Sequence, residues 1–243
     1  TMALTAVASA SDSVQSNGTI ITRQSTAQIA GVTTAGAVLT IDSNGDGVFD
    51  DGTATASGDG SYTVDVTLTN TATNHGENTF VVRAVSGANS ADSSVKAHLA
   101  VGSVVHFTTN LGAWDVELLD AEAGLTVTNF LNYVTTGAFE NMFVHRTNSG
   151  SAQFVQGGGF KVSDSQITPV DTNAPIQNQF NAANGNGAGT LAMALTDASF
   201  HSGTSGWFIN TTDNSAGFDP GKYTVFGRVI GDGLTVVSQI SNL

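Results

Sequence analysis

Residues 143–160 read FVHRTNSGSAQFVQGGGF, and this stretch decides how the second half of the chain is interpreted. It holds Arg146, one of only four arginines in 243 residues, directly after His145. A polar loop follows, and a short apolar run then leads into Gln156 and three glycines. An arginine in so cation-poor a chain, set within such a motif, is a better candidate for a functional group than for an incidental surface charge.

Three further motifs follow this stretch, each mixing apolar residues with small or polar ones. They are Thr190-Leu-Ala-Met-Ala194, Thr204-Ser-Gly-Trp-Phe208 and Phe218-Asp-Pro-Gly-Lys-Tyr223. Upstream, apolar alternation on both sides of an Asn-Leu-Gly turn predicts a β-hairpin over 105–118. Helices are predicted at 125–135 and 234–240, where apolar residues recur at helical spacing. In the first helix these residues are Val127, Phe130, Leu131 and Val134, and in the second Val236, Val237 and Ile240.

In this order and at these spacings, the motifs from Val104 to Leu243 resemble those of the cyclophilin-type peptidyl-prolyl cis/trans isomerases. The resemblance implies a closed, eight-stranded antiparallel β-barrel capped by two helices. It also implies an active site on the outer barrel surface, a shallow groove with one apolar pocket for proline. Catalysis in such a site needs no cofactor, and the expected partners are proline-containing polypeptides.

The resemblance also assigns roles to single residues. Arg146 matches the catalytic arginine, Gln156 matches the glutamine that orients it, and Phe208 matches the phenylalanine at the base of the proline pocket. The expected substrate-binding positions are Phe154, Ala194, Leu195, Gly206, Phe218 and Tyr223. For the phenylalanines alone, core packing would be the default interpretation, and only their place in these motifs favours the pocket.

The chain departs from the family pattern in two places. Gly206 stands where the family usually has a glutamine that hydrogen-bonds the substrate backbone, and the polar loop 147–153 replaces a more apolar segment. We therefore expect an isomerase of reduced activity. The alternative is a module that binds proline-containing segments, or serves adhesion, with little turnover.

Residues 1–101 differ from residues 102–243 in composition and in the spacing of their apolar segments. We therefore expect two domains, with the boundary between residues 101 and 102. The first half has no proline and contains short β-branched strands separated by Asn, Gly, Asp and Ser clusters. This spacing is typical of a two-sheet β-sandwich. The order of its IAGVTTAGA, GDGSYTVDV and NTFVVRA motifs resembles the immunoglobulin-like repeats of bacterial surface proteins.

One loop of the first half has a calcium-binding pattern. Oxygen-bearing side chains occupy positions 1, 3, 5 and 9 of the pattern, with a glycine at the sharp turn. The candidate ligands are Asp42, Asn44, Asp46, Asp50 and Asp51. Position 12 is Thr53 rather than glutamate, and the flanks look like strands rather than helices. A plain Asp/Asn/Gly turn without calcium is the alternative.

Charge and composition limit the remaining functions. Twenty acidic residues against seven basic ones give a net charge of −13, so binding to nucleic acid or anionic lipid is not expected. No apolar run approaches the roughly 18 residues of a membrane-spanning helix. Cysteine is absent, which excludes disulfides and thiolate chemistry.

We expect a periplasmic or secreted bacterial protein. The polar surface is predicted to consist of Ser, Thr, Asn and Gly rather than charged residues, which suits an exported β-protein. Residues 1–10, TMALTAVASA, end in a small-x-small pattern and are either the remnant of an export signal or a first strand. The sequence leaves the clients and the oligomeric state open.

Overall fold

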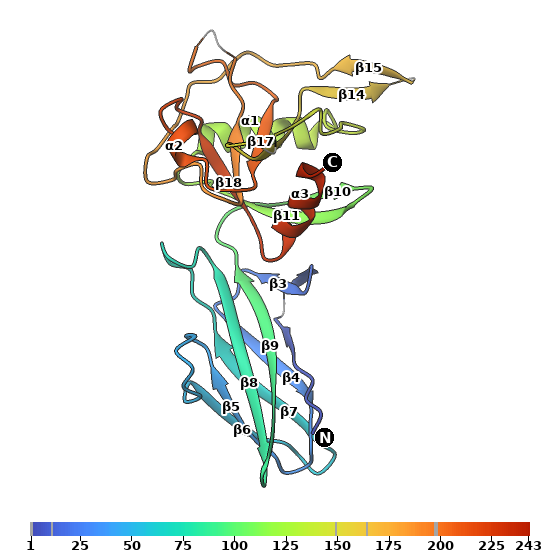
Figure 1. The fold of residues 1–243 in the computed structure, drawn as a ribbon, viewed down its shortest axis with the longest axis vertical. Coiled ribbons are helices and arrows are strands. Elements are labelled where there is room, and N and C mark those ends of the chain that lie inside the picture. The colour runs from blue at the N-terminus through green and yellow to red at the C-terminus, as the bar shows by residue number, and fades with distance from the viewer. Residues whose placement is uncertain (1, 11, 149, 164, 197–198) are drawn as a thin grey trace. The chain divides into compact units, whose positions relative to one another are not determined.

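The computed structural model describes all residues except 1, 11, 149, 164 and 197–198. Its chain divides into two compact units, Thr1–Val101 and Gly102–Leu243 (Figure 1). We call them unit 1 and unit 2 and describe each by itself. Among the described residues, no helix combines the length and the apolar character that a membrane span requires.

Unit 1 consists of two β-sheets. The first has the order β1-β4-β7, with β1 at Val7–Ser9, β4 at Thr26–Val32 and β7 at Ser61–Thr67. The second has the order β2-β3-β9-β8-β5-β6. Its strands are β2 (Val14–Ser16), β3 (Thr19–Thr22), β5 (Val38–Asp42), β6 (Gly52–Thr55), β8 (Glu77–Ser86) and β9 (Asn89–Leu99). Neighbouring strands are antiparallel except for the parallel pair β3 and β9.

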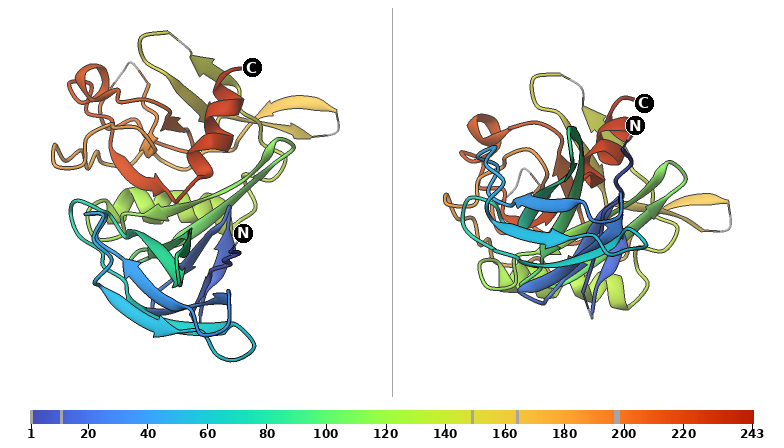
Figure 2. Two further views of the ribbon diagram at one scale, coloured as in Figure 1. Left: turned by 60° about the horizontal axis from the view of Figure 1, so that its bottom comes forward. Right: turned by 90° about the horizontal axis from the view of Figure 1, so that it is seen from below.

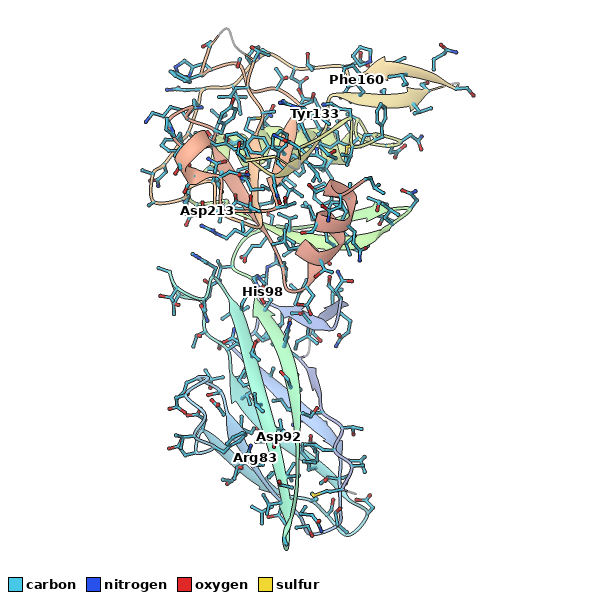
Figure 3. The ribbon with its side chains drawn as sticks, viewed as in Figure 1. Arg83, Asp92, His98, Tyr133, Phe160 and Asp213 are labelled. Atoms are coloured by element: carbon cyan, nitrogen blue, oxygen red, sulfur yellow. The ribbon has the colours of Figure 1, made fainter. Side chains whose placement is uncertain are left out.

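The two sheets of unit 1 share one apolar core. In β8, Phe80, Val82 and Ala84 alternate with outward residues and are almost completely buried, and Ile29 of β4 joins the same cluster from the other sheet. On the outer face of β8, Arg83 forms an ion pair with Asp92 of β9 at 2.7 Å (Figure 3). The expected mostly-β, two-sheet organisation is therefore present, whereas an immunoglobulin-like topology stays a prediction.

Unit 2 is built on a curled, seven-stranded antiparallel sheet with the order β10-β11-β18-β16-β17-β13-β12. The strands are β10 (Val104–Thr109), β11 (Gly112–Leu118), β12 (Arg146–Asn148), β13 (Phe154–Gly157), β16 (Thr190–Met193), β17 (Trp207–Asn210) and β18 (Val225–Val229). A separate hairpin pairs β14 (Phe160–Ser163) with β15 (Gln166–Pro169), and it projects from the rest of the unit in every view (Figures 1 and 2). The helices are α1 (Gly124–Thr135), α2 (Ser215–Phe218) and α3 (Gly233–Ser241).

Aromatic rings fill the core of unit 2. Phe107 stacks on Trp114 with ring centroids 5.1 Å apart, and Trp207 meets Phe107 edge-on at 5.3 Å. The predicted helices are both present, and Val237 and Ile240 of α3 are buried as expected. The orientation predicted for α1 is wrong at one position, because Val134 is 40% exposed while Tyr133 is buried. The Tyr133 hydroxyl has a polar contact inside the unit, accepting a hydrogen bond from the Asn173 N–H at 2.8 Å.

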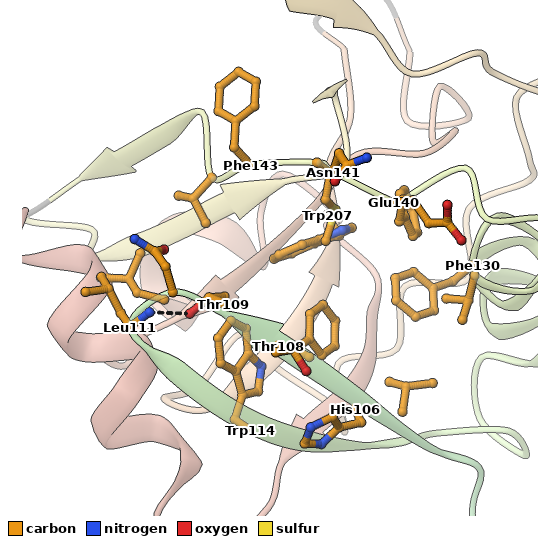
Figure 4. A pocket seen from close by; sticks show the side chains of 18 of the residues that line it. His106, Thr108, Thr109, Leu111, Trp114, Phe130, Glu140, Asn141, Phe143 and Trp207 are labelled. Atoms are coloured by element: carbon orange, nitrogen blue, oxygen red, sulfur yellow. Dashed lines mark hydrogen bonds between the residues drawn. The ribbon is translucent and has the colours of Figure 1, made fainter. Parts of the chain in front are cut away.

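The sheet differs from the expected closed eight-stranded barrel. Seven strands are described in it, with β10 at one end and β12 at the other. A cavity of about 1120 Å³ is lined by β10, by residues of the segment 137–144 and by Thr147 of β12. The rings of Trp114, Phe130 and Trp207 surround it (Figure 4). The described sheet is thus a curled half-barrel, open along β10.

Candidate active site

Strand pairing places Arg146 and Gln156 opposite each other. Arg146 begins β12, and the register with β13 aligns it with Gln156. The Arg146 Nη1 donates a long hydrogen bond of 3.4 Å to the Gln156 Oε1. Its guanidinium carbon lies 5.0 Å from the ring centroid of Phe154, within cation–π range. Because Arg146 remains exposed, a bound peptide can contact its free N–H groups.

An apolar cluster lies beside this arginine, on the outer face of the sheet. In β17, Trp207 and Ile209 belong to the inner core, so Phe208 between them faces the opposite side. Phe208 pairs with Gln156 of β13 and with Ala192 of β16. The buried members of this cluster are Phe154, Ala192, Phe208 and Val225, and its partly buried members are Leu119, Ala194, Phe218 and Tyr223. The structure thus brings most of the predicted pocket residues together.

Four aromatic rings form the walls of this cluster. The ring centroid of Phe208 lies 5.8 Å from Phe154, 5.3 Å from Phe218 and 5.5 Å from Tyr223. The interplanar angles in these three pairs lie between 61° and 82°, so the rings meet edge to face. Edge-to-face pairs have a favoured geometry. We call these four rings the aromatic pocket.

Two further predicted positions lie just outside the strands β16 and β17. Gly206, predicted at a substrate-binding position, directly precedes β17, which begins at Trp207. It lies beside Ala194, whose N–H donates to the Gly206 carbonyl at 3.0 Å. Leu195 packs on the inner core of unit 2 rather than on the aromatic pocket. It follows the end of β16 by two residues, where strand alternation no longer fixes the direction of a side chain.

His145 borders the site without joining it. Its ring meets Phe160 of β14 edge-on at 5.1 Å; Phe160 is labelled in Figure 3. Burial lowers the pKa of His145 below its ordinary value, and among the described residues its Nδ1 has no hydrogen-bond partner. A neutral imidazole here adds no second positive charge beside Arg146.

The glycine run 157–159 has a steric role that the sequence analysis missed. A Cβ on Gly157 would lie 2.5 Å from the Trp207 ring, and a Cβ on Gly159 would lie 3.0 Å from the His145 ring. Gly158 also adopts a φ of 77°, in the left-handed region. The sequence feature that could have predicted this close packing is the run of three consecutive glycines between an expected strand and an aromatic residue.

The predicted calcium ligands take part in hydrogen bonds within their own turn. Both Asp42 oxygens accept backbone N–H groups, from Gly45 at 2.7 Å and Gly47 at 3.0 Å. Asp51 accepts from the N–H and the hydroxyl of Ser43. In the described part of the chain, no three His, Asp or Glu side chains converge as a metal site would require. Calcium binding by Asp42, Asn44, Asp46, Asp50 and Asp51 therefore remains a prediction without structural support.

Comparisons with known proteins agree on the family of unit 2. The family model of the cyclophilin type peptidyl-prolyl cis-trans isomerase/CLD matches residues 104–243. A peptidyl-prolyl cis-trans isomerase of Acinetobacter baylyi is 36% identical over 152 residues, which are 61% of this chain and 77% of that protein. Peptidyl-prolyl cis-trans isomerase B of Escherichia coli is 38% identical, over 58% of this chain and 85% of that protein. The isomerase cyp18 of Streptomyces antibioticus is 40% identical, over 58% and 84%.

Among solved structures, a Cryptosporidium parvum cyclophilin crystallised in the presence of the dipeptide Ala-Pro superimposes with a TM-score of 0.47. It is 21% identical and covers 58% of this chain and 85% of that one. The family model spans more than half of the chain, and each of the three relatives is matched over more than two thirds of its length. The chain therefore belongs to the cyclophilin-type peptidyl-prolyl cis-trans isomerases, enzymes that interconvert the cis and trans forms of the peptide bond preceding proline.

Proposed function

We propose that Arg146, Gln156 and the aromatic pocket form the site at which this isomerase acts on proline-containing polypeptides. Rotation about the prolyl C–N bond breaks no covalent bond, but it removes the resonance that keeps the amide planar. The resulting barrier is about 18–20 kcal/mol for a peptide bond. A catalyst must therefore bind the twisted amide more tightly than either planar form.

The arrangement of the site suits this task. In the aromatic pocket the partly exposed rings of Phe218 and Tyr223 lie beside the buried ring of Phe208 and give the proline ring an apolar surface, while the acyl side of the bond remains free to turn. The Arg146 guanidinium is held by Gln156 above Phe154, at the edge of the pocket. From there it donates N–H groups to the substrate carbonyl and to the prolyl nitrogen as that nitrogen loses its amide character. A 10⁵-fold acceleration by such contacts requires only about 7 kcal/mol.

The observation that carries the proposal is the position of an exposed cation over the ring of a buried phenylalanine at the edge of an apolar cluster. The test is a prolyl-isomerisation assay on a short peptide with the parent and Arg146→Ala. We expect kcat/KM to fall by at least about a hundredfold, which corresponds to about 3 kcal/mol of lost transition-state stabilisation.

The same assay separates catalysis from mere binding. A module that only binds proline-containing segments would bind the proline peptide without accelerating its cis/trans isomerisation. Parent-like rates in Arg146→Ala would instead show that another group acts on the amide.

We also propose that the clients are exported bacterial proteins and that unit 1 is an immunoglobulin-like accessory domain. The composition, rich in Ser, Thr, Asn and Gly with only 11% charged residues, and the two-sheet architecture of unit 1 support this proposal. Fractionation of producing cells tests the location, and recovery of the protein solely from the cytoplasm would refute it.

A further inference from the structure

Behind the aromatic pocket lies a set of buried amides that the sequence analysis did not single out. Asn186 and Asn210 have no exposed surface, and Asn214 is 4% exposed. They come from three separate places: the loop before β16, the end of β17 and the residue preceding α2. We call them the asparagine network.

The three side chains are hydrogen-bonded to one another. The Asn214 Nδ2 donates to the Asn210 Oδ1 at 2.8 Å. The Asn210 Nδ2 donates to the Asn186 Oδ1 at 3.3 Å and to the Thr190 hydroxyl at 2.9 Å. Each amide thus uses both its donor and its acceptor, as a buried amide must to avoid a desolvation cost.

The outer ends of the asparagine network reach the backbone next to the pocket rings. Asn214 also donates to the carbonyl of Gln153, the residue before Phe154, at 2.8 Å. Asn186 donates to the carbonyl of Tyr223 at 3.1 Å and, through its Nδ2 and its backbone N–H, to the Asp219 carboxylate at 2.9 Å.

Every ring of the aromatic pocket has such an anchor close by in sequence. Asp219 directly follows Phe218, and Asn210 lies two residues after Phe208. One connected set of hydrogen bonds therefore joins the chain segments that carry all four rings.

The ring of Phe218 depends most on these anchors. It ends α2, which has four residues and none that is buried. Apart from the ring contacts of Phe218 itself, so short a helix has little buried surface to hold it in place. Asn214 at its start and Asp219 at its end, both tied to Asn186 or Asn210, hold it against the sheet.

We propose that Asn186, Asn210 and Asn214 are positioning residues of the proline pocket, which set the spacing of Phe218 and Tyr223 from Phe208. This inference rests on the proposed function of the aromatic pocket. Since the rings would hold the proline in its planar and its twisted states alike, loosening them should weaken both states equally. The expected signature is a higher KM with kcat nearly unchanged.

The first test is Asn214→Asp, which preserves shape. The new carboxylate still accepts the hydrogen bond from Thr212 but cannot donate to Gln153 or Asn210. We expect KM for a proline peptide to rise roughly three- to tenfold, as loss of hydrogen-bonded anchors of this kind would give. The matched control is Asn78→Asp in unit 1, where a 9% exposed asparagine likewise donates to two carbonyls, of Thr69 and Gly76. Its KM and kcat should equal those of the parent.

A second pair of variants decides the matter even if Asn214→Asp does not fold. Asp219 is only partly buried, so changes there are better tolerated. Asp219→Asn keeps an oxygen that accepts from Asn186, whereas Asp219→Ala removes it. We expect the raised KM in Asp219→Ala and recovery towards the parent value in Asp219→Asn.

Parent-like KM in folded Asn214→Asp, or in Asp219→Ala, would overturn the inference. Measuring Arg146→Ala in the same series keeps two failures apart. Parent-like rates in Arg146→Ala would overturn the proposed function, whereas loss of rate there with unchanged KM in the network variants would overturn only the positioning role.

Discussion

Replacing Gly206 with glutamine should raise kcat/KM for short proline peptides, mainly by lowering KM. Gly206 occupies the place where relatives are expected to present a glutamine to the substrate backbone. One added hydrogen bond between neutral groups is worth about 0.5–1.5 kcal/mol, or a gain of roughly two- to twelvefold. The surroundings tolerate the change, because a Cβ at Gly206 meets only the Ala194 Cβ, at 3.2 Å. That contact is tight but requires a shift of only a few tenths of an ångström.

The control for this prediction is Gly206→Ala, which adds the Cβ without the amide. It removes the conformational freedom of glycine in the unfolded chain, so both variants share any gain in stability. The assay is the initial rate of peptide isomerisation over a range of substrate concentrations. If the glutamine and alanine variants have the same KM, the amide makes no contact with substrate and the groove is used differently.

Three other measurements test separate parts of the structure. Gly157→Ala should lower the free energy of unfolding of unit 2 by about 1–3 kcal/mol in urea, because the added Cβ would lie 2.5 Å from the Trp207 ring. The control is Gly124→Ala, which should not destabilise the unit, because a Cβ there meets no atom within 4 Å. The pKa of His145 is lowered by burial, so the unfolded chain takes up this proton more readily, and the free energy of unfolding should fall as pH drops through about 6.5. His145→Gln should remove that part of the slope, and an identical pH dependence in the variant would contradict the assignment. Calcium at millimolar concentration should raise the melting temperature of unit 1 through the loop 42–51, and an unchanged melting curve before and after chelation would leave a plain turn.

Local periodicity accounts for the parts of the fold that the sequence predicted well. The alternation of Val105 and Phe107 is observed in β10, and the helical spacing of Val237 and Ile240 is observed in α3. Both patterns depend on residues close in sequence. The error at Val134 has a different origin. Which of two neighbouring helical residues faces the core depends on what packs against the helix, and Tyr133 is the larger side chain with a polar partner available.

The residues of the candidate site that belong to sequence motifs could be predicted, whereas those whose role depends on being buried could not. Arg146, Gln156 and Phe208 lie together because β12, β13 and β17 are adjacent in the sheet. The asparagine network gave no such signal. Asn186 stands in a run of Asn and Gly, and Asn214 in a run of Thr and Asp, which both look like ordinary exposed loops. Only the three-dimensional structure shows that segments distant in the sequence bury these amides.

The two faces of β17 explain why an apolar pocket forms on the outside of this sheet. Trp207 and Ile209 are buried in the inner core, so Phe208, with opposite orientation, must have apolar neighbours of its own. Phe154 is buried beside it, whereas Phe218 and Tyr223 reach it from a short helix and a loop and remain partly exposed. An outer cluster with a buried base in the sheet and partly exposed walls keeps apolar surface available for a proline ring. Because the segments that carry Phe218 and Tyr223 are held by hydrogen bonds as well as by ring contacts, the spacing of the pocket should respond to changes in the asparagine network while the core of unit 2 stays intact.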